Sequence, residues 1–245
     1  MKLKKYHLYR LNYCENASLQ PVLVNIVFTL YYFLLPGKSH VTQRGLLVCF
    51  VLYAALVSQG LLVVQVYAGP LFQKALPSMS STVASVLFAL ASIVSGVVAA
   101  YLIDMIGRRP LMIYGSLATG LSSVILGSQI QLNWGPNWLT AIFMYLYCIA
   151  FTVGPGSVPF VIVAEVFMPE VKSLASMIAM EWAFFCMFVV LFIFNPLVNS
   201  LGLGAVFYIF AMCSLISATF CFYYLPETKG LAVDEIQERL KQPRQ

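Results

Sequence analysis

The sequence predicts an all-α integral membrane protein built from six transmembrane helices. Of its 245 residues, 61% are hydrophobic and only 9% are charged, whereas a soluble domain is about half apolar and about a quarter charged. The charged residues separate uncharged blocks, each long enough for one or two helices of about 20 residues, the length that crosses a bilayer core. The Lys and Arg residues are dispersed over short loops and tails, so no nucleic-acid-binding face is predicted.

Each span is assigned from the borders of these blocks. Two blocks are too long for a single helix, and the turn-forming stretches QLNWGPN (131–137) and NPLVNSLGLG (195–204) divide them. The predicted spans are about 46–68, 80–104, 110–130, 138–164, 172–195 and 203–225.

The two ends of the chain lie outside the six-helix unit, which covers residues 44–225. Within residues 1–43 the apolar run Val22–Leu35 is only about 14 residues long, so we expect an interfacial or re-entrant segment rather than another span. If this run did cross the bilayer, Asn16 in the sequon Asn16-Ala17-Ser18 would become a candidate glycosylation site. The tail 226–245 contains LAVDEIQERLKQ, predicted to be either a short amphipathic surface helix or a solvated tail.

The distribution of Lys and Arg orients the spans. The loops 105–109 and 165–172 and the tail after residue 225 carry most of these residues, whereas the opposite loops carry only Lys74. Because cytoplasmic loops are enriched in Lys and Arg, the two loops and the C-terminus are predicted to be cytoplasmic in a multi-pass protein of the plasma membrane.

The sequence predicts no metal site, no cofactor and no enzymatic activity. Most cysteines lie in apolar runs and none shows CxxC spacing, which favours small buried hydrophobes over metal ligands or disulfides. An intramembrane enzyme needs at least a pair of ionisable or metal-binding residues at membrane depth. His7 and His40 lie outside the spans, so they supply no such pair.

Three charged motifs mark the predicted cytoplasmic side, and a fourth motif interrupts a span. The charged motifs are DMIGRR (104–109) after the second span, Ala164-Glu165 followed by Lys172 after the fourth, and PETKG (226–230) after the sixth. GPGSVPF (154–160) places two glycines and two prolines within six positions of the fourth span. Glycine permits a close turn, and arginines at helix ends can pair with nearby acids.

Together these motifs resemble the sugar porter family of the major facilitator superfamily, in particular insect facilitated trehalose transporters and animal glucose facilitators. Typical members show D/E-R-x-G-R-R, G-P-G-P-I-P-W, A-E, R and P-E-T-K-G in the order in which this chain shows its counterparts. The resemblance covers about residues 44–240 and corresponds to the second half of such a transporter, so six further spans would be expected upstream.

The resemblance implies a fold and a mechanism. Each half of such a transporter is a pair of inverted three-helix repeats, and the solute binds near the middle of the membrane between the halves. Interrupted helices at corresponding repeat positions point to that site. Proline kinks that serve packing alone are the alternative. The predicted breaks or hinges are Gly60, with Gly69-Pro70 after it, in the first span, and Gly154, Pro155, Gly156 and Pro159 in the fourth.

The resemblance also implies a cytoplasmic gate. In the family, an inner salt-bridge set holds the two halves closed and breaks when the carrier opens inward. Met105 replaces the usual arginine of this set. The alternative is that the charges only mark the cytoplasmic side, and both interpretations stay open. The matching residues are Asp104, Arg108, Arg109, Glu165 and Lys172.

The solute-binding positions depart from the family pattern. A sugar site needs several amide and hydroxyl side chains, because each buried sugar hydroxyl requires a partner. Leu56 and Val57 stand at the paired glutamines, Leu62 at an asparagine, and Ala183 and Phe184 at another asparagine and a tryptophan. The remaining candidates for solute binding are Gln59, Gln65, Tyr67, Ser92, Thr152, Ser157 and Phe160.

One acid, Glu181, lies inside the fifth span. An ionisable residue within a span is a functional candidate by default. Glu181 follows Lys172 by only nine residues, so a structural acid near the inner end of the helix is the alternative to a proton-linked or cation-binding role.

Two functions remain in competition. The first is transport of a small polar solute, such as a mono- or disaccharide, by alternating access; with only one half present, a second half-transporter or a homodimer would have to enclose the site within the lipid bilayer. The second is a non-transporting, sensor-like or regulatory membrane relative, or a partial gene product. The motifs favour transport, which is the function that we predict for a diverged C-terminal half. The lost amide side chains and the absent first half favour the alternative.

Overall fold

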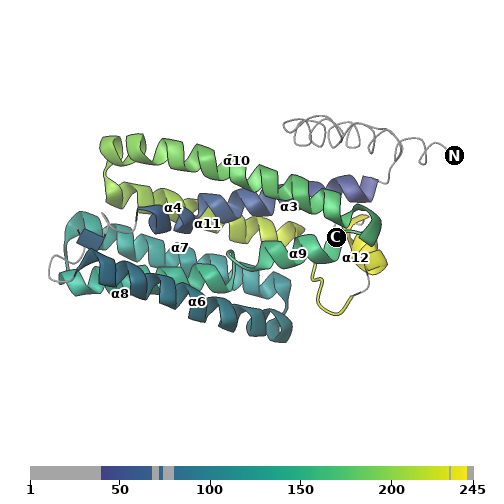
Figure 1. The fold of residues 1–245 in the computed structure, drawn as a ribbon, viewed down its shortest axis with the longest axis horizontal. Coiled ribbons are helices and arrows are strands. Elements are labelled where there is room, and N and C mark those ends of the chain that lie inside the picture. Colours follow the sequence, from purple (N-terminus) through teal and green to yellow (C-terminus); the bar gives the residue numbers. More distant parts are fainter. Residues whose placement is uncertain (1–39, 68–71, 74–79, 232, 242–245) are drawn as a thin grey trace, which may run out of the picture.

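The computed structural model describes residues 40–67, 72–73, 80–231 and 233–241. Within these ranges the chain forms an elongated bundle whose helices run side by side (Figure 1). Five helical segments are long and apolar enough to cross a membrane, and the apolar helix Arg44–Ser58 is shorter. The predicted all-α membrane architecture is therefore confirmed for the part of the chain that the structure describes.

The helices follow the predicted spans closely. The first span consists of α3 (His40–Ser58) and α4 (Leu61–Val66), and the fourth of α8 (Asn137–Val153) and α9 (Val158–Val166). The continuous spans are α6 (Ser81–Ile106), α7 (Arg108–Leu132), α10 (Pro169–Leu201) and α11 (Leu203–Tyr224), and the tail contains α12 (Val233–Lys241).

The predicted end of the fifth span at residue 195 is wrong. Pro196 lies inside α10, which continues to Leu201. Proline lacks the N–H of a regular helix, but helices in membranes tolerate it when neighbouring groups satisfy the freed carbonyl. The helix ends instead at Gly202, whose φ of 83° is readily adopted only by glycine.

Helices α7 and α11 pack closely through small residues. A Cβ atom on Gly127 would lie 2.9 Å from the backbone oxygen of Gly204, and one on Gly120 would lie 3.2 Å from Cβ of Ser214. In a membrane, such small residues let two helices approach closely enough for extensive van der Waals contact. Because α7 ends the first three-helix repeat and α11 ends the second, this contact joins the two repeats.

Several sequence-based predictions lie outside the described residues. They are the interfacial segment Val22–Leu35, the sequon at Asn16 and the Gly69-Pro70 end of the first span.

Candidate solute pathway and charged network

The first span is interrupted at Gly60, between α3 and α4. Gly60 has φ 88° and ψ −2°, a left-handed conformation that favours glycine. A Cβ atom on this residue would overlap two ring carbons of Phe210 on α11. The Tyr147 hydroxyl on α8 donates a hydrogen bond to the backbone oxygen of Gln59. The interruption is thus packed closely, and the backbone oxygen of Gln59 has a hydrogen-bond partner.

The fourth span is interrupted at residues 154–157, between α8 and α9. A Cβ atom on Gly154 would lie 2.7 Å from Cα of Gly115 on α7. The Ser157 hydroxyl donates to the backbone oxygen of Thr152 at 2.7 Å, and the Gly156 N–H donates to that of Phe151 at 2.8 Å. Local groups therefore satisfy the backbone that the interruption would otherwise leave unpaired.

The two interruptions occupy corresponding places in the two repeats. Each lies in the first span of its repeat, and each contacts the last span of the other repeat: Gly60 contacts α11, and Gly154 contacts α7. The structure therefore places the breaks at the positions named from the sequence. Their action as hinges stays a prediction.

Replacing Gly60 by alanine is expected to destabilise the bundle by about 1–3 kcal/mol, because the new methyl group overlaps the Phe210 ring and the left-handed backbone disfavours a Cβ atom. Thermal unfolding in detergent measures the effect. Gly230→Ala is the matched control, since Gly230 also has a positive φ, 71°, but open space around it. Equal shifts for both variants would show that the Phe210 contact contributes nothing.

The structure buries Gln59 completely. Its relative exposure is 0%, and both amide atoms of its side chain lack a hydrogen-bond partner among the described residues. A buried unpaired polar group costs about 1–3 kcal/mol. In this conformation the Gln59 amide reaches neither solvent nor a polar neighbour.

Tyr67 at the end of α4 contacts α10. Its hydroxyl accepts a hydrogen bond from Nδ2 of Asn195 at 2.9 Å, and its ring lies 4.9 Å from that of Phe194. Gln65 nearby is exposed. Asn195 was not among the sequence-based candidates, because the predicted turn 195–204 ended the fifth span at this residue. In the structure Asn195 lies within α10, which continues past Pro196.

Two of the other candidates meet at Cys148 on α8. The Ser92 hydroxyl oxygen lies 3.0 Å from Sγ of Cys148, and the Thr152 hydroxyl donates to the backbone oxygen of Cys148 at 2.8 Å. Phe160 is exposed and packs edge-on against Tyr53, with 5.4 Å between ring centroids. The structure thus joins α6 and α8 through a small polar contact that the sequence could not reveal.

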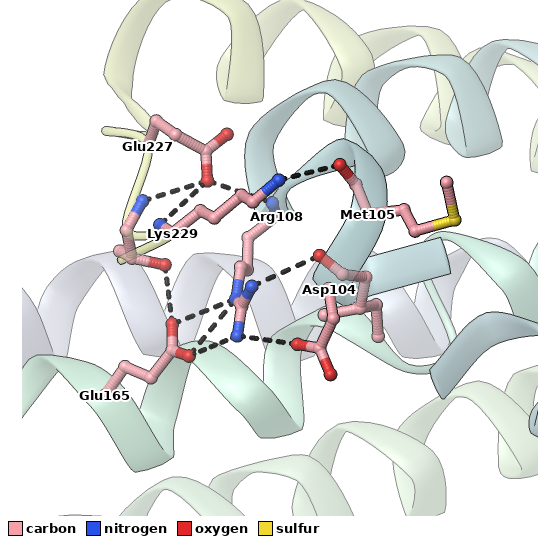
Figure 2. A network of polar contacts seen from close by, with 8 residues as sticks. Asp104, Met105, Arg108, Glu165, Glu227 and Lys229 are labelled. Atoms are coloured by element: carbon pink, nitrogen blue, oxygen red, sulfur yellow. Dashed lines mark hydrogen bonds and ion pairs between the residues drawn. The ribbon is translucent and has the colours of Figure 1, made fainter. Parts of the chain in front are cut away.

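Arg108 forms the centre of a network at one end of the bundle (Figure 2). Its guanidinium donates to both carboxylate oxygens of Glu165, with Nη2 at 2.7 Å from Oε1 and Nε at 3.2 Å from Oε2. Asp104 accepts from Nη2 at 3.2 Å. The Arg108 side chain is only 11% exposed, whereas that of Asp104 is 77% exposed. The ion pair with Glu165 is therefore the shielded, stronger part of the network.

Glu227 caps the N-terminus of α7. Its carboxylate accepts the backbone N–H of Arg108 at 3.0 Å and that of Arg109 at 3.1 Å. A negative charge at this position satisfies unpaired N–H groups and complements the helix dipole. A Cβ atom on Gly107 would lie 2.8 Å from Glu227 Oε2, so glycine leaves room for the cap.

The two residues after Glu227 complete the contact between tail and bundle. The Thr228 hydroxyl donates to Glu165 at 2.6 Å, and the Lys229 ammonium donates to the backbone oxygen of Met105 at 2.7 Å (Figure 2). The sequence-based gate set omitted Glu227, Thr228 and Lys229. The sequence did contain a signal for Glu227. It is an acid directly after the last span, on the same predicted side of the membrane as the Gly-Arg-Arg loop.

The remaining predicted gate residues point elsewhere. Arg109 donates to the backbone oxygen of Phe222 on α11 and lies over its ring, 5.7 Å from the centroid. Lys172 is exposed, and the ion pairs of the described residues do not include it. The network thus brings together Asp104, Arg108 and Glu165, and its contacts all lie within one six-helix unit. A role between two halves stays a prediction.

The family model described as Sugar (and other) transporter matches residues 27–240. The chain belongs to the sugar transporter family. The family assignment agrees with the order of the DMIGRR, GPGSVPF and PETKG motifs and with the contacts that the first and last of them make.

Known sugar transporters and related structures extend the comparison. The facilitated trehalose transporter Tret1 of Bombyx mori is 25% identical over 202 residues, covering 76% of this chain and 40% of that protein. The D-xylose-proton symporter-like 1 of Arabidopsis thaliana is 31% identical over 157 residues, covering 63% of this chain and 31% of that protein. The chain therefore spans less than half the length of these curated relatives.

The fold is that of one half of a major facilitator superfamily protein. The proton:xylose symporter XylE bound to 6-bromo-6-deoxy-D-glucose superimposes with a TM-score of 0.72 at 22% identity, covering 80% of this chain and 42% of the XylE chain. The described His, Cys, Asp and Glu side chains form no group of three or more that could hold a metal ion.

Proposed function

We propose that this chain is one half of a carrier that moves sugar-type solutes across a membrane by alternating access. The observation that carries the proposal is the pair of interruptions at Gly60 and Gly154–Ser157, at corresponding places in the two repeats. In carriers of this superfamily, interrupted spans line the solute site. The family match and the half-superfamily fold support the proposal.

The solute class that we propose is a mono- or disaccharide. The relatives named as trehalose transporter and xylose symporter support this class. The hydroxyls of Thr152 and Ser157 donate to backbone oxygens but keep acceptor lone pairs for a sugar hydroxyl. The other proposed contacts are Gln65, Tyr67, Ser92 and Phe160, with Asn195 orienting the Tyr67 hydroxyl. The complete burial of Gln59 argues against its direct contact with solute in this conformation.

We propose that the Arg108 network lies on the cytoplasmic side of the plasma membrane, together with the loops 105–109 and 165–172 and the C-terminus. The convergence of three basic segments at one end of the bundle supports this orientation. Charges that only marked the cytoplasmic side would not require the burial of Arg108. The network therefore favours a gate in which both repeats of the half move together.

A complete solute site needs a second half, because the proposed contacts lie on one six-helix unit only. We propose that a second half-transporter or a second copy of this chain supplies it. One observation favours the non-transporting alternative: Leu56 and Val57, at the family's paired glutamines, are buried and apolar. The family match favours the carrier, with sugar affinity weakened by these changes.

Uptake into proteoliposomes tests the proposal. The purified chain is reconstituted alone, and together with the part of the Bombyx mori relative that this chain does not cover. We expect saturable uptake of trehalose or glucose in at least one sample. No saturable uptake in either sample would contradict transport and favour a regulatory role.

Thr152→Val is expected to raise KM for that uptake about fivefold, because it removes one hydroxyl worth about 1 kcal/mol. Thr219→Val is the matched control, since Thr219 on α11 makes the same hydroxyl bond to the carbonyl four residues earlier and is exposed. An equal KM for the two variants would remove Thr152 from the solute site.

A further inference from the structure

The connection between α7 and α8 presents two tryptophans at one end of the bundle. Trp134 and Trp138 are 56% and 58% exposed, and Leu132 before them is also exposed. Helix α7 begins at the Arg108 network, so the connection after it lies at the opposite end of the bundle from that network and from α12 (Figure 1). Residues 110–164 contain no Lys, Arg, Asp or Glu. The connection thus exposes large apolar rings without a charged side chain that would hold them in bulk water.

Gln129, near the end of α7, fixes the conformation of this connection. Its side chain is buried. Its Nε2 donates to the backbone oxygen of Gly135 at 2.8 Å, and its Oε1 accepts the backbone N–H of Gly135 at 3.1 Å. Asn133 ends the helix with a φ of 47°, the left-handed conformation that often follows a helix. The two bonds to Gly135 form a clamp that ties the tryptophan-bearing backbone to α7.

The ring of Trp134 lies back along α7. Its indole N–H donates to the Ser128 hydroxyl, with 3.4 Å between nitrogen and oxygen. Ser128 follows Arg108 by 20 residues, which is about 30 Å along a helix and equals the thickness of a bilayer hydrocarbon core. An indole whose N–H is paired can rest at the edge of the hydrocarbon without an unsatisfied donor. The depth and the bonding of Trp134 both suit the membrane–water interface.

Exposed tyrosines form a second aromatic band near the Arg108 network. They are Tyr114 on α7 and Tyr223 and Tyr224 at the end of α11. Along α7, Tyr114 and Leu132 are 18 residues apart, or about 27 Å. Trp and Tyr gather at the two membrane–water interfaces, which a hydrocarbon core of about 30 Å separates. The two bands therefore have the spacing of the two interfaces.

We propose that the α7–α8 connection binds the lipid headgroup region of the leaflet opposite the Arg108 network, through Trp134 and Trp138. The ligand is the glycerol and ester-carbonyl layer of a phospholipid, whose uncharged polar groups suit an uncharged aromatic surface. Because the Gln129 clamp ties the connection to α7, this contact sets the depth of α7 and α8 in the bilayer. The inference does not depend on transport.

Tryptophan fluorescence tests the proposal, because the chain contains three tryptophans. Variants that keep Trp134, Trp138 or Trp182, with phenylalanine at the other two positions, are reconstituted in phosphatidylcholine vesicles. The lipid is brominated either near the headgroup or near the chain end. We expect Trp134 and Trp138 to be quenched more strongly by bromine near the headgroup.

Trp182 is the depth reference within the same molecule. It lies on α10 next to the exposed Glu181 and follows Lys172 by ten residues, so it stands about 15 Å along the helix, near the middle of the core. Bromine near the chain end should quench it more strongly. The unmodified chain needs no substitution to fold, and with two of its three tryptophans at the interface, bromine near the headgroup should be its stronger quencher.

The clamp supplies a second test. Gln129→Leu removes both side-chain bonds to Gly135, so Trp134 should lose its preference for bromine near the headgroup. Gln131→Leu is the matched control, because Gln131 also lies on α7 but is exposed, and it should keep the preference. Equal effects of the two substitutions would contradict the clamp.

The quenching pattern can also overturn the proposal. Quenching of Trp134 and Trp138 by aqueous iodide, with no effect of either brominated lipid, would place the connection in water. Protection from iodide and from both lipids would show that a protein covers it, such as a second copy of the chain. The same depth preference for all three tryptophans would exclude a location at the interface.

Discussion

Replacing Arg108 by methionine is expected to destabilise the bundle by about 2–3 kcal/mol. Methionine keeps the apolar stem of the side chain but removes the paired bonds to Glu165 and the bond from Nη1 to the backbone oxygen of Ile103. Removing one partner of a buried ion pair costs about 3–5 kcal/mol because the other charge is left unpaired. The Glu165 side chain is 26% exposed and also accepts a hydrogen bond from Thr228. Its charge is therefore left only partly unpaired, and the expected loss of stability is smaller than about 3–5 kcal/mol.

Thermal unfolding in detergent measures this loss, which corresponds to about 4–12 °C for a chain of this size. Glu165→Gln and the double variant complete a mutant cycle, in which we expect a coupling energy above about 1 kcal/mol. Arg239→Met is the control, because the exposed pair of Arg239 with Glu235 in α12 should contribute less than about 0.5 kcal/mol. Additive single effects at Arg108 and Glu165 would show that their pairing contributes no stability.

Replacing Gly115 by alanine is expected to destabilise the bundle by about 1–3 kcal/mol, although alanine normally favours a helix. The new Cβ atom would lie 2.6 Å from Cα of Gly154 and 3.0 Å from Cδ of Pro155. Neither atom belongs to a flexible side chain, so α7 and the interrupted α8–α9 span have to separate. A larger residue such as leucine should prevent the folded unit from forming.

Gly96→Ala provides the matched control for this prediction. Gly96 also lies within a continuous span, α6, but nothing stands within 4 Å of a Cβ atom placed there. The control should leave the melting temperature unchanged or raise it, because alanine favours the helix by up to about 1 kcal/mol. A Gly115 variant that melted at or above the temperature of the Gly96 variant would contradict the close contact between the two spans.

The order and approximate bounds of the spans could be predicted from the sequence. A bilayer requires long uncharged segments and leaves the charged residues in the loops, so both features mark the spans directly. The clustering of glycine and proline located the break at Gly154, and the resemblance to the family, with its corresponding repeat positions, located the break at Gly60. The sequence-based prediction failed at Pro196, because proline ends a helix in water but not in every membrane span.

The candidate site was less predictable, because its contacts join residues far apart in the chain. The cap of α7 by Glu227 links positions more than a hundred residues apart, and neither residue alone indicates the contact. The meeting of Ser92 and Thr152 at Cys148 depends on how α6 packs on α8. The complete burial of Gln59 likewise depends on packing that helical periodicity could not specify.

The close contact of α7 with α11 has a consequence for biosynthesis. Helix α7 ends at Leu132 and α11 ends at Tyr224, so the ribosome adds about 90 residues between them, which takes roughly 5–18 s at typical translation rates. During this interval the glycine-lined side of α7 has entered the bilayer without its partner. Emergence of the last span therefore completes assembly of the bundle, and a ribosome that stalled before residue 203 would leave an unfinished bundle as a substrate for membrane quality control.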